Sequence, residues 1–98
     1  MKSIYKISWS GNAIKELENT IDYLEKNFSM KEISNLVLEI EKVSALLAKN
    51  PKLFPIVSSK TKLRKVVVMK FNNLYYTFDE ETVNIASFYS NRQKVKRF

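Results

Sequence analysis

The sequence contains neither cysteine nor histidine. Without cysteine the chain has no disulfides, no thiolate nucleophile and no sulfur-ligated zinc, and without histidine it lacks the commonest general base and metal ligand. Any catalysis must therefore use Lys, Arg, Tyr, Ser, Thr, Asp or Glu. We expect no metal site and no other cofactor.

Glycine, proline and long hydrophobic runs are also scarce. One Gly and two Pro stand beside 45% apolar residues, a composition that excludes a disordered or fibrous chain and favours regular elements joined by short loops. Ninety-eight residues suit a single domain, residues 1–98, with one core. No run approaches the roughly 18 apolar residues that span a bilayer, and residues 1–9 lack an export signal. These absences predict a cytoplasmic protein without a membrane partner.

The net charge of +7 is unevenly distributed along the chain. Residues 51–75 and the basic tail, residues 91–98, contain cations and no acid, whereas residues 76–90 between them contain acids and no cation. Basic blocks of this kind suit a polyanion such as nucleic acid, or an acidic protein partner, through their summed field. The alternative is that a basic protein is merely well solvated.

Hydrophobic spacing predicts one strand and two helices in the amino-terminal half. Residues 4–9 alternate as a strand does, and Ser10 is placed to cap a helix that runs to about Asn27. The apolar face of this helix comprises Ala13, Leu17, Ile21, Leu24 and Phe28.

A capping box predicts the start of the second helix. Ser29 and Glu32 are spaced so that each side chain bonds the other's backbone amide. Pro51 disfavours helical geometry in the residue before it, so the helix ends near Asn50. Two helices joined this tightly form an antiparallel hairpin. The second apolar face comprises Ile33, Leu36, Val37, Ile40, Val43 and Leu47.

Strands dominate the predicted carboxy-terminal half. Residues 51–61 hold two prolines and no periodicity, so we expect a loop there. A tight turn is expected at Asn72-Asn73, because asparagine tolerates positive φ. Alternation predicts strands at residues 63–71, 74–78 and 83–89.

The element order β-α-α-β-β-β predicts an α+β fold. The helix hairpin should pack on one face of a mainly antiparallel four-stranded sheet. The other face of the sheet stays partly open, and function can reside there.

Five cations occur in and just before the strand predicted at residues 63–71. Because strand faces alternate, Arg64 and Lys70 share one face and Lys65 lies on the other, so only a subset can address one ligand. Lysines along a strand edge also protect against aggregation, which is the alternative role. The five are Lys60, Lys62, Arg64, Lys65 and Lys70.

Large aromatics on the last two predicted strands can stack on bases or fill a groove for a partner's apolar residues. Alternation places Tyr76 on one face with Leu74 and Phe78, and Tyr75 on the other with Thr77. About half of these aromatics must therefore belong to the core. The set is Tyr75, Tyr76, Phe88 and Tyr89.

The basic tail directly follows the last predicted strand. Arg92, held at a strand end, can bind a phosphate in bidentate fashion. The remaining tail cations suit a loose, solvated segment. They are Lys94, Lys96 and Arg97.

Short motifs follow one another in a set order along nearly the whole chain: Ile7-Ser8-Trp9-Ser10 before an Ala-led helix, Asn50-Pro51 after the second helix, Leu63-Arg64, Leu74-Tyr75-Tyr76, and Phe88-Tyr89-Ser90-Asn91-Arg92-Gln93. In this order and spacing they resemble the RelE/ParE superfamily of bacterial type II toxin-antitoxin toxins. The element order of that superfamily matches the one predicted above.

The resemblance implies a growth-inhibiting toxin that a cognate antitoxin keeps silent, through a disordered segment that folds onto the toxin. Operator DNA would be contacted only through the antitoxin. RelE-like members cut messenger RNA on the ribosome without a metal, and ParE-like members poison DNA gyrase with no known hydrolytic step.

The ribonuclease branch needs cations around the scissile phosphate and an acid-base group. Lys65, Lys70 and Arg92 match its basic positions, and Tyr89 could substitute as acid. However, Asn73 or Leu74 stands where that branch has an arginine, the tail has no Tyr and the chain no His.

The long helix hairpin, Leu63-Arg64 and the Tyr-rich strand resemble the ParE branch better. We therefore expect gyrase poisoning, with a RelE-like ribonuclease as the alternative and a non-toxic binding module as the second alternative.

Three residue sets follow as expectations. The target-binding set is Arg64, Lys70, Tyr75, Tyr89, Arg92 and Lys94. The catalytic set, if the chain is a ribonuclease, is Lys65, Lys70, Tyr89 and Arg92. The antitoxin-binding set is Leu17, Ile21, Leu24 and Val37.

Overall fold

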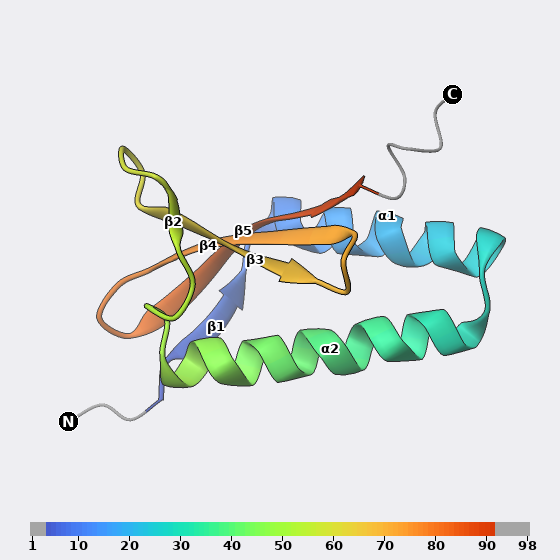
Figure 1. Cartoon of the computed structure of the whole chain (residues 1–98), viewed down its shortest axis with the longest axis horizontal. Helices are drawn as coiled ribbons and strands as arrows, with labels where there is room; N and C mark the ends of the chain where they lie inside the picture. The colour runs from blue at the N-terminus through green and yellow to red at the C-terminus, as the bar shows by residue number, and fades with distance from the viewer. Residues whose placement is uncertain (1–3, 92–98) are drawn as a thin grey trace.

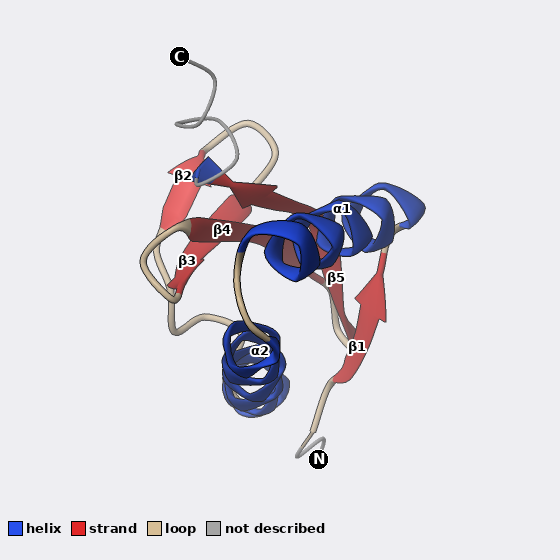
Figure 2. Cartoon of the chain, turned by 90° about the vertical axis from the view of Figure 1, so that its right-hand side faces the viewer, coloured by secondary structure: helices blue, strands red, loops and turns tan. Residues whose placement is uncertain are grey.

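Two helices pack against a mixed five-stranded sheet in the computed structural model, which describes residues 4–91 (Figure 1). The elements are, in chain order, β1 (Lys6–Trp9), α1 (Gly11–Asn27), α2 (Met30–Lys49), β2 (Ile56–Ser58), β3 (Leu63–Val68), β4 (Asn72–Phe78) and β5 (Thr82–Ser90). α2 packs across the sheet, and α1 runs beside β5 beyond the end of β1 (Figure 2). The predicted α+β class is confirmed.

The sheet contains one strand more than the sequence predicted, in the order β1-β5-β4-β3-β2. β1 pairs with β5 in parallel, and the other neighbours are antiparallel. The additional strand, β2, lies within residues 51–61, so the prediction of an uninterrupted loop there was wrong. Three residues are too few to show an alternating pattern, which is why the strand escaped the prediction.

Ser10 caps α1 as predicted. Its Oγ accepts a hydrogen bond from the Ala13 amide at 3.0 Å and donates one to the Ala86 carbonyl of β5 at 3.1 Å. The first bond satisfies one of the amides that a helix start leaves unpaired, and the second ties the helix start to the sheet.

The Ser29 half of the capping box predicted for α2 does not form. The helix begins after Ser29, but the Ser29 side chain makes no capping hydrogen bond. The Glu32 amide instead donates to the Ser29 backbone carbonyl at 3.0 Å. This backbone bond uses the donor that the box required. α2 ends at Lys49, next to the predicted boundary at Asn50.

The turn between β3 and β4 occupies residues 69–71, earlier than predicted. Met69 and Lys70 adopt positive φ, at 54° and 70°. Asn72 is already in the ladder opposite Val68, and its Nδ2 donates to the Val68 carbonyl at 3.0 Å. The predicted Asn72-Asn73 turn was therefore wrong, and so was the placement of Lys70 on a strand. The register that buries Val66 opposite Leu74 overrides the local preference of asparagine.

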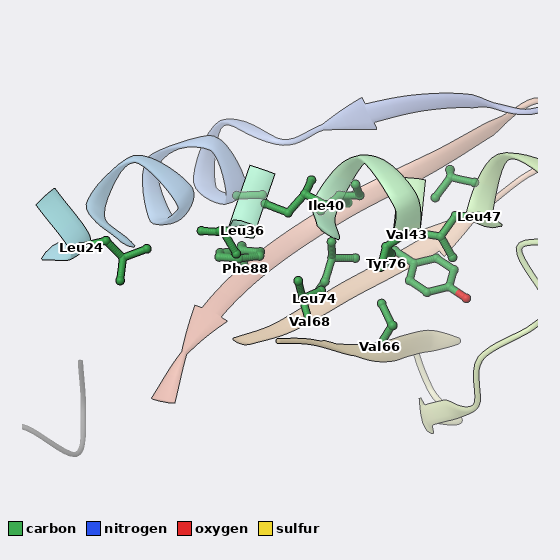
Figure 3. Close-up of a cluster of buried hydrophobic side chains, with 13 residues drawn as sticks. Leu24, Leu36, Ile40, Val43, Leu47, Val66, Val68, Leu74, Tyr76 and Phe88 are labelled. Atoms are coloured by element: carbon green, nitrogen blue, oxygen red, sulfur yellow. The ribbon is translucent and has the colours of Figure 1, made fainter. Parts of the chain in front are cut away.

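The core lies between the helices and the buried face of β3, β4 and β5 (Figure 3). Leu74 and Tyr76 are fully buried while Tyr75 is only half-buried, so the predicted alternation along β4 is confirmed. Burying each large apolar side chain contributes about 1.5 to 3 kcal/mol. The buried apolar set is Ala13, Leu24, Leu36, Ile40, Val43, Leu47, Val66, Val68, Leu74, Tyr76, Val83, Ile85 and Phe88.

Trp9, the chain's single tryptophan, joins β1 to this core. It stands opposite Ile85 in the parallel ladder, and its ring centroid lies 6.2 Å from that of Phe88. The first strand is thereby packed on the centre of the sheet although it is only four residues long.

The two serines that precede the helices provide a matched pair of substitutions. Ser10→Ala should lower the free energy of unfolding by about 1 kcal/mol, because it removes the cap of α1. Ser29→Ala should change it by less than about 0.5 kcal/mol, because that side chain caps nothing. Urea denaturation of both variants measures the difference, and equal losses would contradict the assignment of the caps.

Candidate binding face of the sheet

The face of the sheet that points away from the core gathers a lysine and two tyrosines. In the ladder Lys65 stands opposite Tyr75, and Asn73 stands opposite Tyr89 on the next strand. These side chains alternate with the buried residues of the same strands, so they share the other face. The open face, as we name it, comprises Lys65, Val67, Asn73, Tyr75, Ser87 and Tyr89.

The structure brings together only part of the predicted target-binding and catalytic sets. Lys65, Tyr75 and Tyr89 lie on the open face. Arg64 has the opposite orientation, and Lys70 lies in the β3–β4 turn. Arg92 and Lys94 lie outside the described residues.

Arg64 binds backbone of its own chain. One guanidinium nitrogen donates to the Phe54 carbonyl at 2.6 Å and to the Lys52 carbonyl at 3.2 Å. The guanidinium carbon lies 5.5 Å from the centroid of the Phe78 ring, within the range of a cation–π contact. Arg64 therefore holds the segment after α2 against the sheet.

Tyr76 binds the same segment after α2, at Pro51, one residue before the first carbonyl that Arg64 contacts. Its hydroxyl points out of the end of the core (Figure 3) and donates to the Pro51 carbonyl at 2.7 Å. Burial raises the pKa of the Tyr76 phenol above its ordinary value, and a backbone hydrogen bond and the nearby Arg64 charge oppose part of that rise. Arg64 and Tyr76 stand opposite each other in the β3–β4 ladder, so their hydrogen bonds attach the segment after α2 to the same place on the sheet.

Glu16 is a structural residue that the sequence did not reveal. Its carboxylate accepts hydrogen bonds from the Phe88 amide at 2.8 Å and the Ser87 hydroxyl at 2.9 Å. Because β1 ends at Trp9, this part of β5 has no strand of residues 4–91 on its β1 side, and the carboxylate takes the place of a strand carbonyl there. A glutamate on a helix has no sequence signature for such a role. Ser87 is accordingly engaged at the rim of the open face.

The four residues predicted to bind an antitoxin are divided between core and surface. Leu24 is buried, and Leu17 and Ile21 pack partly against the core. Val37 is 40% exposed, on a side of α2 where Leu38 is also exposed. Of this set, α2 therefore offers the most accessible apolar side chain.

Among residues 4–91 there is no group of three or more His, Cys, Asp or Glu side chains that could hold a metal ion. Within the same residues, no helix has the length and apolar character needed to cross a membrane. A lysine opposite one tyrosine, with a second tyrosine on the same face, suits an anionic or aromatic partner.

The chain matches no protein-family model and no curated protein sequence.

Replacing Arg64 tests its structural role. Arg64→Ala should lower the free energy of unfolding by about 1.5 to 3 kcal/mol, because charge-assisted hydrogen bonds to two carbonyls are lost. Arg64→Lys should restore little of this, because an ammonium group lacks the guanidinium's planar array of donors. Lys65→Ala, one residue along but on the other face, is the control and should shift stability by less than about 0.5 kcal/mol. A loss as large in the control would contradict the assignment.

Tyr76 predicts a dependence of stability on alkaline pH. Its pKa is raised in the folded chain above the unfolded value near 10, so its contribution is complete below about pH 10 and declines as pH rises toward the folded pKa. Tyr76→Phe removes the hydrogen bond to Pro51, so its free energy of unfolding at neutral pH should be about 1 kcal/mol below that of the wild type. Between about pH 9.5 and 11 the free energy of unfolding of this variant should fall less than that of the wild type.

Chemical denaturation across this pH range measures both effects. Tyr75→Phe, on the open face, is the matched control and should keep the wild-type decline. An unchanged alkaline decline in Tyr76→Phe would show that the buried phenol is not its source.

Proposed function

We propose that the chain is the toxin of a type II toxin-antitoxin pair of RelE/ParE type, which arrests growth by ParE-like poisoning of DNA gyrase until a cognate antitoxin neutralises it. The open face is the observation that carries the proposal, because it gathers Lys65, Tyr75 and Tyr89 on the side of the sheet opposite the core. Tyr75 and Tyr89 belong to the target-binding set expected from the sequence, whereas Lys65 belongs to the set expected for catalysis.

The order of the elements supports the same proposal. A first strand, two helices joined by a short connection and then antiparallel strands follow the layout that the motif resemblance implied. The additional β2 extends the sheet at its margin and leaves this layout unchanged.

Ribosome-dependent cleavage of messenger RNA is the second candidate. The open face favours it in one respect, because Lys65 can hold a phosphate while the ring of Tyr75, opposite it, stacks on a base. Yet only Lys65 of the described basic residues proposed for that chemistry lies on this face, since Lys70 is in the turn. A single cation supports binding of a target better than stabilisation of a phosphoryl transition state.

Expression of the chain alone in a bacterium tests the proposal. We expect growth arrest with accumulation of gyrase–DNA cleavage complexes. The triple variant Lys65→Ala, Tyr75→Ala and Tyr89→Ala should remain folded and lose at least about tenfold in toxicity, the loss of roughly 1.4 kcal/mol of target binding. The matched control Lys15→Ala, Glu18→Ala and Lys26→Ala, on the exposed side of α1, should remain toxic.

Three other outcomes distinguish the alternatives. Growth arrest with ribosome-dependent cuts in messenger RNA and intact gyrase activity would replace gyrase by the RNA target. Robust growth with abundant folded protein would leave a non-toxic binding module. Full toxicity of the open-face variant would move the target-binding surface elsewhere.

A further inference from the structure

A small cavity lies between the helix hairpin and the sheet, at the end where β5 finishes and β4 begins. Its polar lining comes from α1, α2, β4 and β5, which supply Thr20, Glu32, Asn72 and Ser90 respectively. The cavity offers about 10 Å³ to the centre of a water-sized molecule, which is room for about one. Four elements therefore meet around a space of atomic size.

The polar side chains that are buried among residues 4–91 gather at this cavity. Thr20, Asn72 and Ser90 are 4%, 7% and 8% exposed, and all three line it. Asn72 and Ser90 stand opposite each other in the β4–β5 ladder, one residue from Asn73 and Tyr89 of the open face, so they point to the core side. Burying polar groups costs free energy unless they find partners, so their partners are informative.

Internal hydrogen bonds leave two oxygen atoms for a ligand. Thr20 Oγ1 donates to the Glu16 carbonyl, and Asn72 Nδ2 donates to the Val68 carbonyl, both at 3.0 Å. Within residues 4–91 no hydrogen bond reaches Asn72 Oδ1 or Ser90 Oγ. No completely buried side-chain nitrogen or oxygen of these residues lacks a partner, so the two oxygens are still reached by solvent. A molecule in the cavity can bind both.

The lining selects a positively charged hydrogen-bond donor. The Glu32 carboxylate can only accept hydrogen bonds, and Thr20 has already donated its proton. Asn72 offers a carbonyl oxygen, while the Ser90 hydroxyl can turn to accept. Among the described residues, no cation lines the cavity. An anion would thus meet a carboxylate and mostly acceptors, although the chain as a whole carries a charge of +7.

The size of the space narrows the ligand to an ammonium group. The apolar part of the wall is Leu24, Leu36 and Met69, which lowers the local dielectric and strengthens the attraction of a cation to the carboxylate. An ammonium nitrogen is close to a water molecule in size, whereas a planar guanidinium is several atoms wide. Hard divalent cations take six or more oxygen ligands, and four polar side chains line this cavity.

We propose that this cavity binds a single ammonium group, held by Asn72 Oδ1, Ser90 Oγ and the Glu32 carboxylate. We name it the ammonium pocket. The group is supplied by a free ammonium ion or by a lysine of the basic tail. Bound there, it joins the start of α2 to the end of the sheet, on the side away from the open face. The proposal is independent of whether the chain arrests growth. The contrary occupant is one neutral water molecule.

The experiment titrates the full chain with ammonium chloride at constant ionic strength and follows the side-chain amide signal of Asn72 by NMR. We expect a saturable shift, which sodium chloride should not produce. Tetramethylammonium chloride, which is larger and has no N–H donor, should not produce it either. Binding should also lower the equilibrium constant for unfolding by about tenfold when ammonium is present at about ten times its Kd.

The tail variant Lys94→Ala with Lys96→Ala distinguishes the two sources of the ammonium group. If a tail lysine occupies the pocket, its removal ends a competition, and the variant should bind ammonium at least about tenfold more tightly than the wild type. Equal affinities would assign the pocket to the free ion. If the three salts act alike on both the wild type and the tail variant, the proposal is overturned and water is the occupant.

Two substitutions in the pocket test the assigned contacts. Ser90→Ala removes one oxygen, and Glu32→Gln removes the charge while keeping an acceptor oxygen. Each should weaken ammonium binding by about tenfold, as expected for a hydrogen bond to a charged group. Ser34→Ala, at an exposed position of α2, is the matched control and should keep the affinity within about twofold. Unchanged affinity in both pocket variants would overturn the proposal. If either fails to fold, the comparison of salts decides.

Discussion

The register of β3 on β4 is the constraint on which the rest of the structure depends. Val66 stands opposite Leu74, and both are buried. Because side chains alternate, the same alignment sends Lys65 and Tyr75 to the other face. A slip of one residue would exchange the two faces of β3 and expose apolar side chains that the core requires. The core and the candidate binding face are thus two sides of one hydrogen-bond ladder.

Arg64 and Lys65, neighbours on β3, lie on opposite faces of the sheet and have different roles. The Arg64 guanidinium reaches two carbonyls and a ring at once, which suits its planar array of donors. Together with the Tyr76 hydroxyl, the Arg64 guanidinium fixes the segment between α2 and β2. Lys65 remains for the open face. Adjacent cations in a sequence can therefore have unrelated roles.

Elements with a long periodic pattern could be predicted from the sequence. Elements that are set by pairing with another strand could not. The spacing of Leu36, Ile40, Val43 and Leu47 along α2, like the alternation along β4, records burial directly, so both were predictable. The turn at residues 69–71 and the three-residue β2 are set by pairing, which no local pattern encodes. The partners of Arg64 and Glu16 are backbone groups distant in sequence, so these roles also required the structure.

The position of Trp9 makes its fluorescence a probe of how β1 is attached to the sheet. The chain has a single tryptophan, and its half-buried indole lies against Phe88, on the core side of β5. Indole emission therefore reports whether the first strand, the centre of the sheet and the core remain assembled. Tyr75 and Tyr89 project from the other side, so a ligand on the open face would meet tyrosine chromophores and leave the indole environment unaltered. A change in indole emission would therefore report loss of the fold rather than occupancy of the open face.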